Sequence, residues 1–162
     1  MAQQSWTNND GFTIDTNKNF LDVDVIYDFL HNESYWAKEI TKDLVVEAIR
    51  NSTLCYGIYE GNPTEGKAKQ VGFARVVSDL VRFAWLGDVF VVPEYRGRGL
   101  SKWLISTITN HPQLKGVSFQ LATGDAHGLY AQYGFHPIDH IERKMERTMN
   151  WDEIHRGHEL NK

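Results

Sequence analysis

The chain has 162 residues, which is typical of a single domain with one hydrophobic core. Hydrophobic residues make up 41% of the sequence and charged residues 23%, and these values exclude a largely disordered or fibrous protein. The formal net charge is −4, so the chain has no excess of basic residues to neutralise phosphate groups, and we expect no binding to nucleic acid.

The sequence shows no targeting signal or membrane-spanning segment. Its first twelve residues lack the basic and apolar regions of a secretory signal, and no apolar run approaches ~20 residues. The single cysteine, Cys55, cannot form an internal disulfide, which fits a reducing compartment but also a cysteine-poor secreted protein. We predict a cytoplasmic protein with no membrane partner.

The first part of the chain is expected to form one strand and two helices. Phe12–Asp15 alternates between apolar and polar residues, as a strand does. Leu21–His31 has apolar residues at helical spacing behind a candidate cap, Asp22. Thr41 begins a second helix, which ends near Asn51.

Three strands should follow. Leu54–Glu60 and Gln70–Ser78 alternate, and the polar, turn-rich segment between them predicts a hairpin. Phe83–Val92 is almost continuously apolar, which is typical of a central strand, and Pro93 ends it.

The remaining elements alternate between helix and strand. Residues 99–111 have the apolar spacing of a helix, Val117–Leu121 that of a strand, and Ala126–Tyr133 that of a short helix. From Phe135 to about Arg147 we expect one or two further strands. The last dozen residues are polar, and we expect them to fray.

A glycine-rich basic turn joins the central strand to the next helix. Gly97 and Gly99 let backbone N–H groups approach a ligand, and the start of the helix adds free N–H groups and a partial positive charge. Arg96, Arg98 and Lys102 add full charges. This combination predicts a site for an anion such as pyrophosphate, the alternative being a strand-to-helix turn that is merely basic.

Two other phosphate motifs fit less well. A dinucleotide-binding fingerprint needs a third glycine where Lys102 stands. The segment Gly61–Lys67 resembles a P-loop, but Ala68 replaces the serine or threonine that would hold Mg²⁺, and the segment lies between two strands.

Two segments of the chain resemble the GNAT superfamily of N-acetyltransferases. Arg96–Ser101 (RGRGLS) resembles the acetyl-CoA motif of that family. Ala126–Phe135 (AHGLYAQYGF) resembles its later signature, in which a tyrosine, here Tyr130, precedes a Gly-Phe pair by four residues. The expected order β-α-α-β-β-β-α-β-α-β is also similar. The resemblance implies an α/β GNAT fold: a mixed, mostly antiparallel, splayed sheet flanked by about four helices.

The resemblance also implies domain limits, a function and a cofactor site. It covers residues 12–147, with an N-terminal extension (1–11) and a polar C-terminal tail (148–162) outside. It implies direct transfer of an acetyl group from acetyl-CoA to an amine in a ternary complex, without a metal. The backbone of the central strand would pair with the pantetheine arm, and the turn would hold the pyrophosphate. The implied cofactor-binding residues are Val89, Phe90, Val91, Arg96, Gly97, Arg98, Gly99, Leu100, Ser101 and Lys102.

Tyr130 is the candidate general acid, because the resemblance places it near the cofactor sulfur. A free tyrosine, with a pKa near 10, is well matched to an alkyl thiolate that must be protonated as it leaves. The alternative is a tyrosine that only packs under the fold. Tyr133 is a weaker candidate, because its place in the pattern is usually apolar.

Asp88 is the candidate for handling the amine proton. A carboxylate is costly to bury in an apolar strand, so it could take the proton through a water or bind the ammonium form. The alternative is a structural, hydrogen-bonded aspartate. For Asp125 we favour capping of the following helix over catalysis, and for His127 a surface position. Thr123 departs from the family pattern, in which many members carry asparagine.

Tyr35, Trp36 and Trp85 are the candidate substrate-binding residues. Aromatic walls suit a cationic or aromatic amine, and in this fold the connector that holds Tyr35 and Trp36 often covers the acceptor site. The alternative is packing in the core or against another subunit. Because many family members dimerise, a homodimer is also compatible with the resemblance.

Other functions stay open at this point. The same fold could bind CoA or acetyl-CoA as a non-catalytic sensor, or act as a regulatory domain that binds phosphate without CoA. We expect Cys55 to be a buried, inert thiol. His155 and His158 have metal-like spacing but no further ligands nearby in sequence, so we predict no metal site. The acceptor is predicted to be a small-molecule amine.

Overall fold

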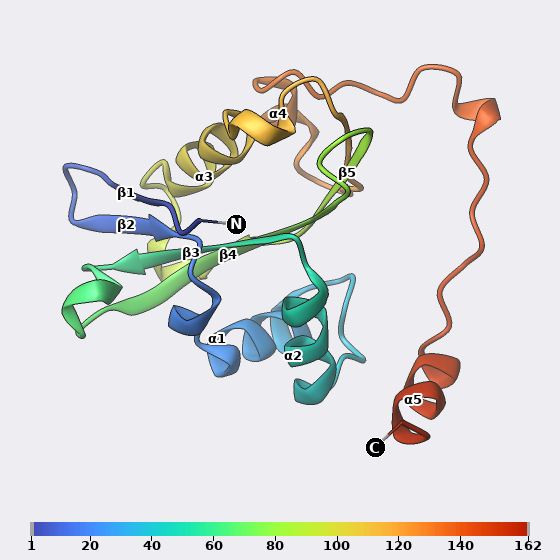
Figure 1. The fold of residues 1–162 in the computed structure, drawn as a ribbon, viewed down its shortest axis with the longest axis horizontal. Helices are drawn as coiled ribbons and strands as arrows, with labels where there is room; N and C mark the ends of the chain where they lie inside the picture. Colours follow the sequence, from blue (N-terminus) through green and yellow to red (C-terminus); the bar gives the residue numbers. More distant parts are fainter. Residues whose placement is uncertain (1, 162) are drawn as a thin grey trace.

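The core of the protein is one open sheet. Within residues 2–161, which the computed structural model describes, six strands lie side by side in chain order (Figure 1). The strands are β1 (Ser5–Thr7), β2 (Phe12–Asp15), β3 (Leu54–Glu60), β4 (Lys69–Ser78), β5 (Phe83–Val91) and β6 (Ser118–Gln120). Neighbouring strands are antiparallel except β5 and β6, which are parallel. The predicted hairpin of β3 and β4 is therefore confirmed. The strand predicted at Phe83–Val92 is β5, which has a neighbour on each side but lies next to the edge strand β6 and not at the centre of the sheet.

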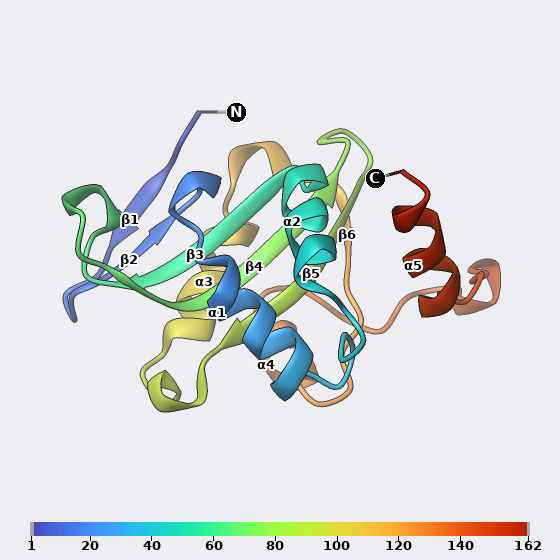
Figure 2. The same cartoon turned by 90° about the horizontal axis from the view of Figure 1, so that it is seen from below.

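Helices cover both faces of this sheet (Figures 1 and 2). The helices are α1 (Val23–Asp28), α2 (Lys42–Asn51), α3 (Leu100–Thr109), α4 (His127–Ala131) and α5 (Trp151–Glu159). One face packs against α3 and α4, and the other against α1 and α2. Successive side chains of β3 point to opposite faces of the sheet: Tyr56 faces the α3 side, and Cys55 faces the α1 and α2 side. The mixed α/β fold predicted for the family is confirmed.

The first two helices begin at the residues that the sequence indicates. The Asp22 carboxylate accepts hydrogen bonds from the N–H groups of Asp24 and Val25, and the Thr41 hydroxyl accepts one from Leu44. After α1 the chain continues through one wider helical turn at Phe29–Glu33. Residues 34–41, called the connector below, then lead to α2.

The strands predicted between Phe135 and Arg147 are wrong. Within the described part of the chain, residues 136–150 are exposed and contain one short helical turn, Ile141–Arg143, but no strand. Pro137 has no N–H to donate to a ladder, and His140 has a left-handed backbone with φ 55°. Apolar residues alone do not make a strand, because a strand also needs a neighbouring edge to pair with.

The two ends of the chain carry more structure than expected. Residues 5–7 form the edge strand β1, which pairs with β2. The C-terminal residues form α5, at the end of the long extended segment (Figure 1). The Asn150 side chain caps this helix by accepting a hydrogen bond from the N–H of Glu153, and Trp151 and Ile154 pack against the α1 and α2 cluster. None of the helices in residues 2–161 is long and apolar enough to cross a membrane.

Candidate active site

Strand β5 is only partly covered by β6. In the described chain, β6 pairs with β5 over Phe83–Trp85, whereas β4 pairs with β5 as far as Val91. From Leu86 to Val91, the side of β5 that faces β6 therefore has no ladder partner. We call this stretch the open edge. It contains the three residues expected to pair with a pantetheine arm, and its backbone groups can pair with an added extended chain.

A β-bulge bends the open edge. Phe73 pairs with Phe90 and Arg75 with Gly87, so Asp88 and Val89 together lie opposite one residue of β4. Asp88 has a φ of 53°, in the left-handed region, which costs an ordinary L-residue about 1–2 kcal/mol. The bulge increases the local twist where β5 and β6 separate. The Phe90 side chain stacks on Phe29 at 4.0 Å between ring centroids and stabilises the strand from the α1 side.

The glycine-rich turn follows the open edge after the short helical turn Pro93–Tyr95. Residues 96–99 are exposed, and Gly97 and Gly99 have φ values of 78° and 75°, which favour glycine. Leu100 is buried in the core and fixes the start of α3, while Ser101 and Lys102 lie in its first turn. The exposed backbone of the turn and the free N–H groups of α3 therefore form one continuous surface that suits a diphosphate.

The basic residues of the turn are held in different ways. Arg96 Nε donates a hydrogen bond to the carbonyl of Val91 at 3.2 Å, so this side chain folds back onto the end of β5. The Arg98 guanidinium lies 5.0 Å from the centre of the Tyr95 ring, and Lys69 Nζ approaches the same ring at 5.4 Å. Lys69 comes from β4 and adds a cation that the sequence motif does not contain.

Tyr130 lies in α4, which follows β6. Its side chain is 8% exposed and packs edge-on against Phe135. Burial raises the pKa of the Tyr130 hydroxyl to about 12, and the nearby Tyr35 and Asp125 add to the rise. The hydroxyl is therefore protonated at any ordinary pH, which a proton donor requires.

The turn before α4 is capped by Thr123 and not by Asp125, which corrects our expectation. The Thr123 hydroxyl accepts hydrogen bonds from the N–H groups of Ala126 at 3.0 Å and Asp125 at 3.4 Å. A threonine hydroxyl is an ordinary cap of a turn, and the sequence motif gave no reason to prefer it.

The connector brings the two sides of the site together. Trp36 Nε1 donates a hydrogen bond to Asp88 Oδ1 at 2.9 Å on β5, and Tyr35 Oη accepts one from the N–H of Gly124 at 2.7 Å, in the loop before α4. The Tyr35 and Trp36 rings meet edge to face, 4.9 Å apart, and are 58% and 36% exposed. The two predicted aromatic residues thus bridge the β5 wall and the α4 wall.

Arg75 is a site residue that the sequence analysis missed. Its Nε donates a hydrogen bond to Asp88 Oδ2 at 2.6 Å, and its Nη1 approaches Ser52 Oγ at 3.4 Å. An arginine within the apolar strand β4, with an aspartate in the otherwise apolar next strand, was the signal that could have revealed it. The indole of Trp85 lies beside Gly87 on β5, because a Cβ added at Gly87 would come 3.4 Å from the indole nitrogen.

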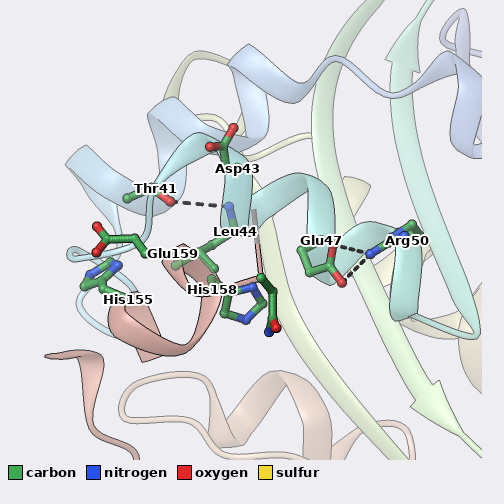
Figure 3. Close-up of a pocket in the computed structure, with 9 residues that line it drawn as sticks. Thr41, Asp43, Leu44, Glu47, Arg50, His155, His158 and Glu159 are labelled. Carbon is green, nitrogen blue, oxygen red and sulfur yellow. Dashed lines mark hydrogen bonds and ion pairs between the residues drawn. The ribbon is translucent and has the colours of Figure 1, made fainter. Parts of the chain in front are cut away.

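A separate pocket of about 450 Å³ lies between α2 and α5 (Figure 3). Its lining residues are Thr41, Asp43, Leu44, Glu47, Arg50, His155, His158, Glu159 and Asn161. Across residues 2–161 the structure assembles no group of three or more histidine, cysteine or acidic side chains that could hold a metal ion. This pocket is remote in sequence from the glycine-rich turn and from Tyr130, and we assign it no role in the site.

Comparison with known proteins places these features in a family. A sequence profile for the acetyltransferase (GNAT) domain matches residues 51–137, which include the open edge, the glycine-rich turn and Tyr130. A Gibberella zeae protein, whose name assigns it provisionally to the acetyltransferases, is 30% identical over 118 residues, or 65% of this chain. An uncharacterised N-acetyltransferase-like protein of Prochlorococcus marinus is 36% identical over 45% of the chain. The two matches span 66% and 39% of these relatives' own lengths.

Solved structures agree. A Xanthomonas campestris protein assigned to the GNAT family is 46% identical, with a TM-score of 0.78 over 85% of this chain and 93% of that one. A Deinococcus radiodurans protein has the same fold at 14% identity, with a TM-score of 0.65 over 92% of this chain and 95% of that one. The profile covers more than half of the chain, and the fold agrees with it. The chain is a member of the GNAT family of acetyltransferases.

Proposed function

We propose that this protein transfers an acetyl group from acetyl-CoA to the amine of a small molecule, by direct attack in a ternary complex. The observation that carries the proposal is the open edge of β5, which leads through the short helical turn Pro93–Tyr95 to the exposed glycine-rich turn at the start of α3. An extended chain with amide groups and a diphosphate at one end matches this pairing edge and this anion site.

The chemistry needs three things from the protein. In the reaction the amine nitrogen forms a bond to the thioester carbonyl carbon, the C–S bond breaks, and the sulfur leaves as a thiolate. A backbone N–H of the open edge, near Val89, would donate a hydrogen bond to the carbonyl oxygen as negative charge develops there. Tyr130 would give its proton to the thiolate, and the proton lost by the amine would pass to a base or to water.

The amine must also lose a proton to a base or to water. Asp88 is the candidate from the sequence, but Trp36 and Arg75 already donate to its two carboxylate oxygens. This arrangement supports the structural alternative for Asp88. Tyr35, Trp36 and Trp85 present aromatic surface on the acceptor side, which supports an amine in its cationic form as the ligand that is first bound.

The test is to incubate the purified protein with acetyl-CoA and a panel of small amines and to follow free CoA with a thiol reagent. The single cysteine suits this assay, because Cys55 is buried and burial raises the pKa of its thiol to about 11. We expect at least one amine to raise CoA release above hydrolysis. If calorimetry shows CoA binding but no amine is acetylated, the protein is a CoA sensor, and if CoA does not bind, the cofactor proposal is wrong. A cytoplasmic location and a homodimer stay predictions.

A further inference from the structure

Four side chains from different parts of the chain form one hydrogen-bonded series beside the open edge. Ser52 follows α2, Arg75 lies in β4, Asp88 lies in the bulge of β5, and Trp36 lies in the connector. Arg75 Nη1 approaches Ser52 Oγ at 3.4 Å and its Nε donates to Asp88 Oδ2 at 2.6 Å, while Trp36 Nε1 donates to Asp88 Oδ1 at 2.9 Å. The connector is thus joined to the sheet through the carboxylate of Asp88.

The burial of the Asp88 carboxylate would cost free energy if its contacts with Arg75 and Trp36 were lost. Its side chain is 10% exposed and that of Arg75 is 24% exposed, so both charges are largely removed from water. A charge in such a position is stable only when it is paired and hydrogen-bonded. The strained backbone of Asp88, with a φ of 53°, aims the carboxylate between Arg75 and Trp36.

The connector is held on its other side as well. Tyr35, the neighbour of Trp36, accepts the hydrogen bond of the Gly124 N–H in the loop that leads to α4 and Tyr130. Two consecutive residues are therefore held by opposite walls of the site. If the contact between Trp36 and Asp88 is lost, the connector stays anchored by Tyr35 and by the buried Ala37 and Ile40, but the Trp36 ring is no longer fixed relative to β5.

We propose that Arg75, Asp88 and Trp36 form a latch that positions the connector over the acceptor side of the site, and that Asp88 is a positioning residue and not the general base. The proposal rests on the proposed acetyltransferase function. Both carboxylate oxygens of Asp88 serve the latch, one for the indole and one for the guanidinium. The latch orders the aromatic surface of Tyr35 and Trp36 before the amine arrives, which lowers the entropy lost on binding.

Steady-state kinetics separates a latch from a base. In Trp36→Phe and Arg75→Gln we expect the KM for the amine to rise about tenfold, the loss typical of one hydrogen bond to a charged group. We expect kcat and the KM for acetyl-CoA to change less than about threefold, and the acidic limb of the pH profile of kcat/KM to stay in place. A base at Asp88 predicts the opposite: a shifted acidic limb in Arg75→Gln and an unchanged amine KM in Trp36→Phe, and this result would overturn the proposal.

A second measurement needs no substrate. The indole ¹H–¹⁵N resonance of Trp36, assigned by its loss in Trp36→Phe, should move and exchange faster with water in Arg75→Gln and in Asp88→Ala. Trp6→Phe is the matched control, in which the Trp36 resonance should stay unchanged, because Trp6 stacks on Tyr56 near the opposite edge of the sheet. A Trp36 resonance that does not change in Asp88→Ala means that the latch does not exist in solution. If the resonance behaves as expected but no amine is acetylated, the acetyltransferase proposal fails instead.

Discussion

The hydroxyl oxygen of Tyr35 accepts a hydrogen bond from the backbone N–H of Gly124 at 2.7 Å, although 89 positions separate the two residues. This contact ties the connector to the loop that leads into α4. Gly124 allows it, because an added Cβ would come 3.1 Å from the Tyr35 hydroxyl. The contact brings Tyr35 near Tyr130, and Tyr35 helps to raise the pKa of the Tyr130 hydroxyl.

The first prediction concerns this contact. Tyr35→Phe removes the acceptor of the Gly124 N–H, so amide hydrogen exchange at Gly124 should become faster, while the core amides of β3 and β4 keep their protection. Tyr27→Phe is the matched control, because Tyr27 stacks on His31 in the α1 region. Unchanged exchange at Gly124 in Tyr35→Phe would show that the contact is not formed in solution.

The second prediction concerns the general acid. Tyr130→Phe keeps the packing against Phe135 but removes the proton for the thiolate, so kcat should fall about 10²–10⁴-fold. The KM for acetyl-CoA should change little. Because the pKa of Tyr130 is raised to about 12, wild-type turnover should show no loss from its ionisation up to about pH 10. Tyr133→Phe serves as the control, and wild-type turnover in Tyr130→Phe would disprove the assignment.

The third prediction concerns pH and stability. Asp79 Oδ1 accepts hydrogen bonds from the N–H groups of Val81, Arg82 and Phe83, and these lower the pKa of the carboxyl from 3.8 to about 2. As pH falls, the unfolded chain binds a proton near 3.8 while the folded chain stays charged. The stabilisation is therefore present above about pH 4 and is lost as pH falls towards 2.

We expect Asp79→Ala to lower the free energy of unfolding at pH 7, and the difference from wild type to shrink below pH 4. Urea unfolding at pH 7, 5, 4 and 3 measures it. Asp79→Asn keeps an acceptor oxygen without a charge, so its difference from wild type at pH 7 should be smaller, but it should narrow by the same amount below pH 4, because only the wild-type carboxyl titrates. A constant difference for Asp79→Ala at all four pH values would contradict the lowered pKa.

The fourth prediction uses two glycines with opposite expectations. At Gly72 in β4 an added Cβ would come 2.9 Å from the carbonyl oxygen of Phe90, within the open edge, so Gly72→Ala should lower stability by about 1–3 kcal/mol. At Gly128 in α4 no atom lies within 4 Å of an added Cβ, so Gly128→Ala should raise stability, by up to about 1 kcal/mol. Chemical denaturation of both variants measures whether the free energy of unfolding falls in Gly72→Ala and rises in Gly128→Ala. Equal effects would show that the approach of Gly72 to Phe90 is not tight.

Local patterns predicted much of the fold. The alternation of Leu54–Glu60 matches β3, and the caps Asp22 and Thr41 begin helices where expected. The glycine-rich turn was also visible, because glycines, arginines and a helix start are local features. Such signals depend on residues within a few positions of one another, so one sequence contains all the information that they need.

The elements that the sequence analysis got wrong depend on distant partners. Residues 135–147 include apolar residues, but in the described chain no sheet edge pairs with them, and local sequence does not reveal an edge. The C-terminal residues form α5 because Trp151 and Ile154 pack on a cluster made by α1 and α2, more than 100 positions earlier. A polar stretch with few apolar residues gives no sign of such a surface.

The same distinction applies to the site. Composition and local spacing determined that an apolar strand is followed by a basic, glycine-rich turn and that a tyrosine follows in a short helix. Only the tertiary structure decided what surrounds Asp88, because Arg75 comes from the neighbouring strand and Trp36 from a connector 52 positions away. A carboxylate's role depends on the groups that donate to its oxygens, and folding brought those groups together.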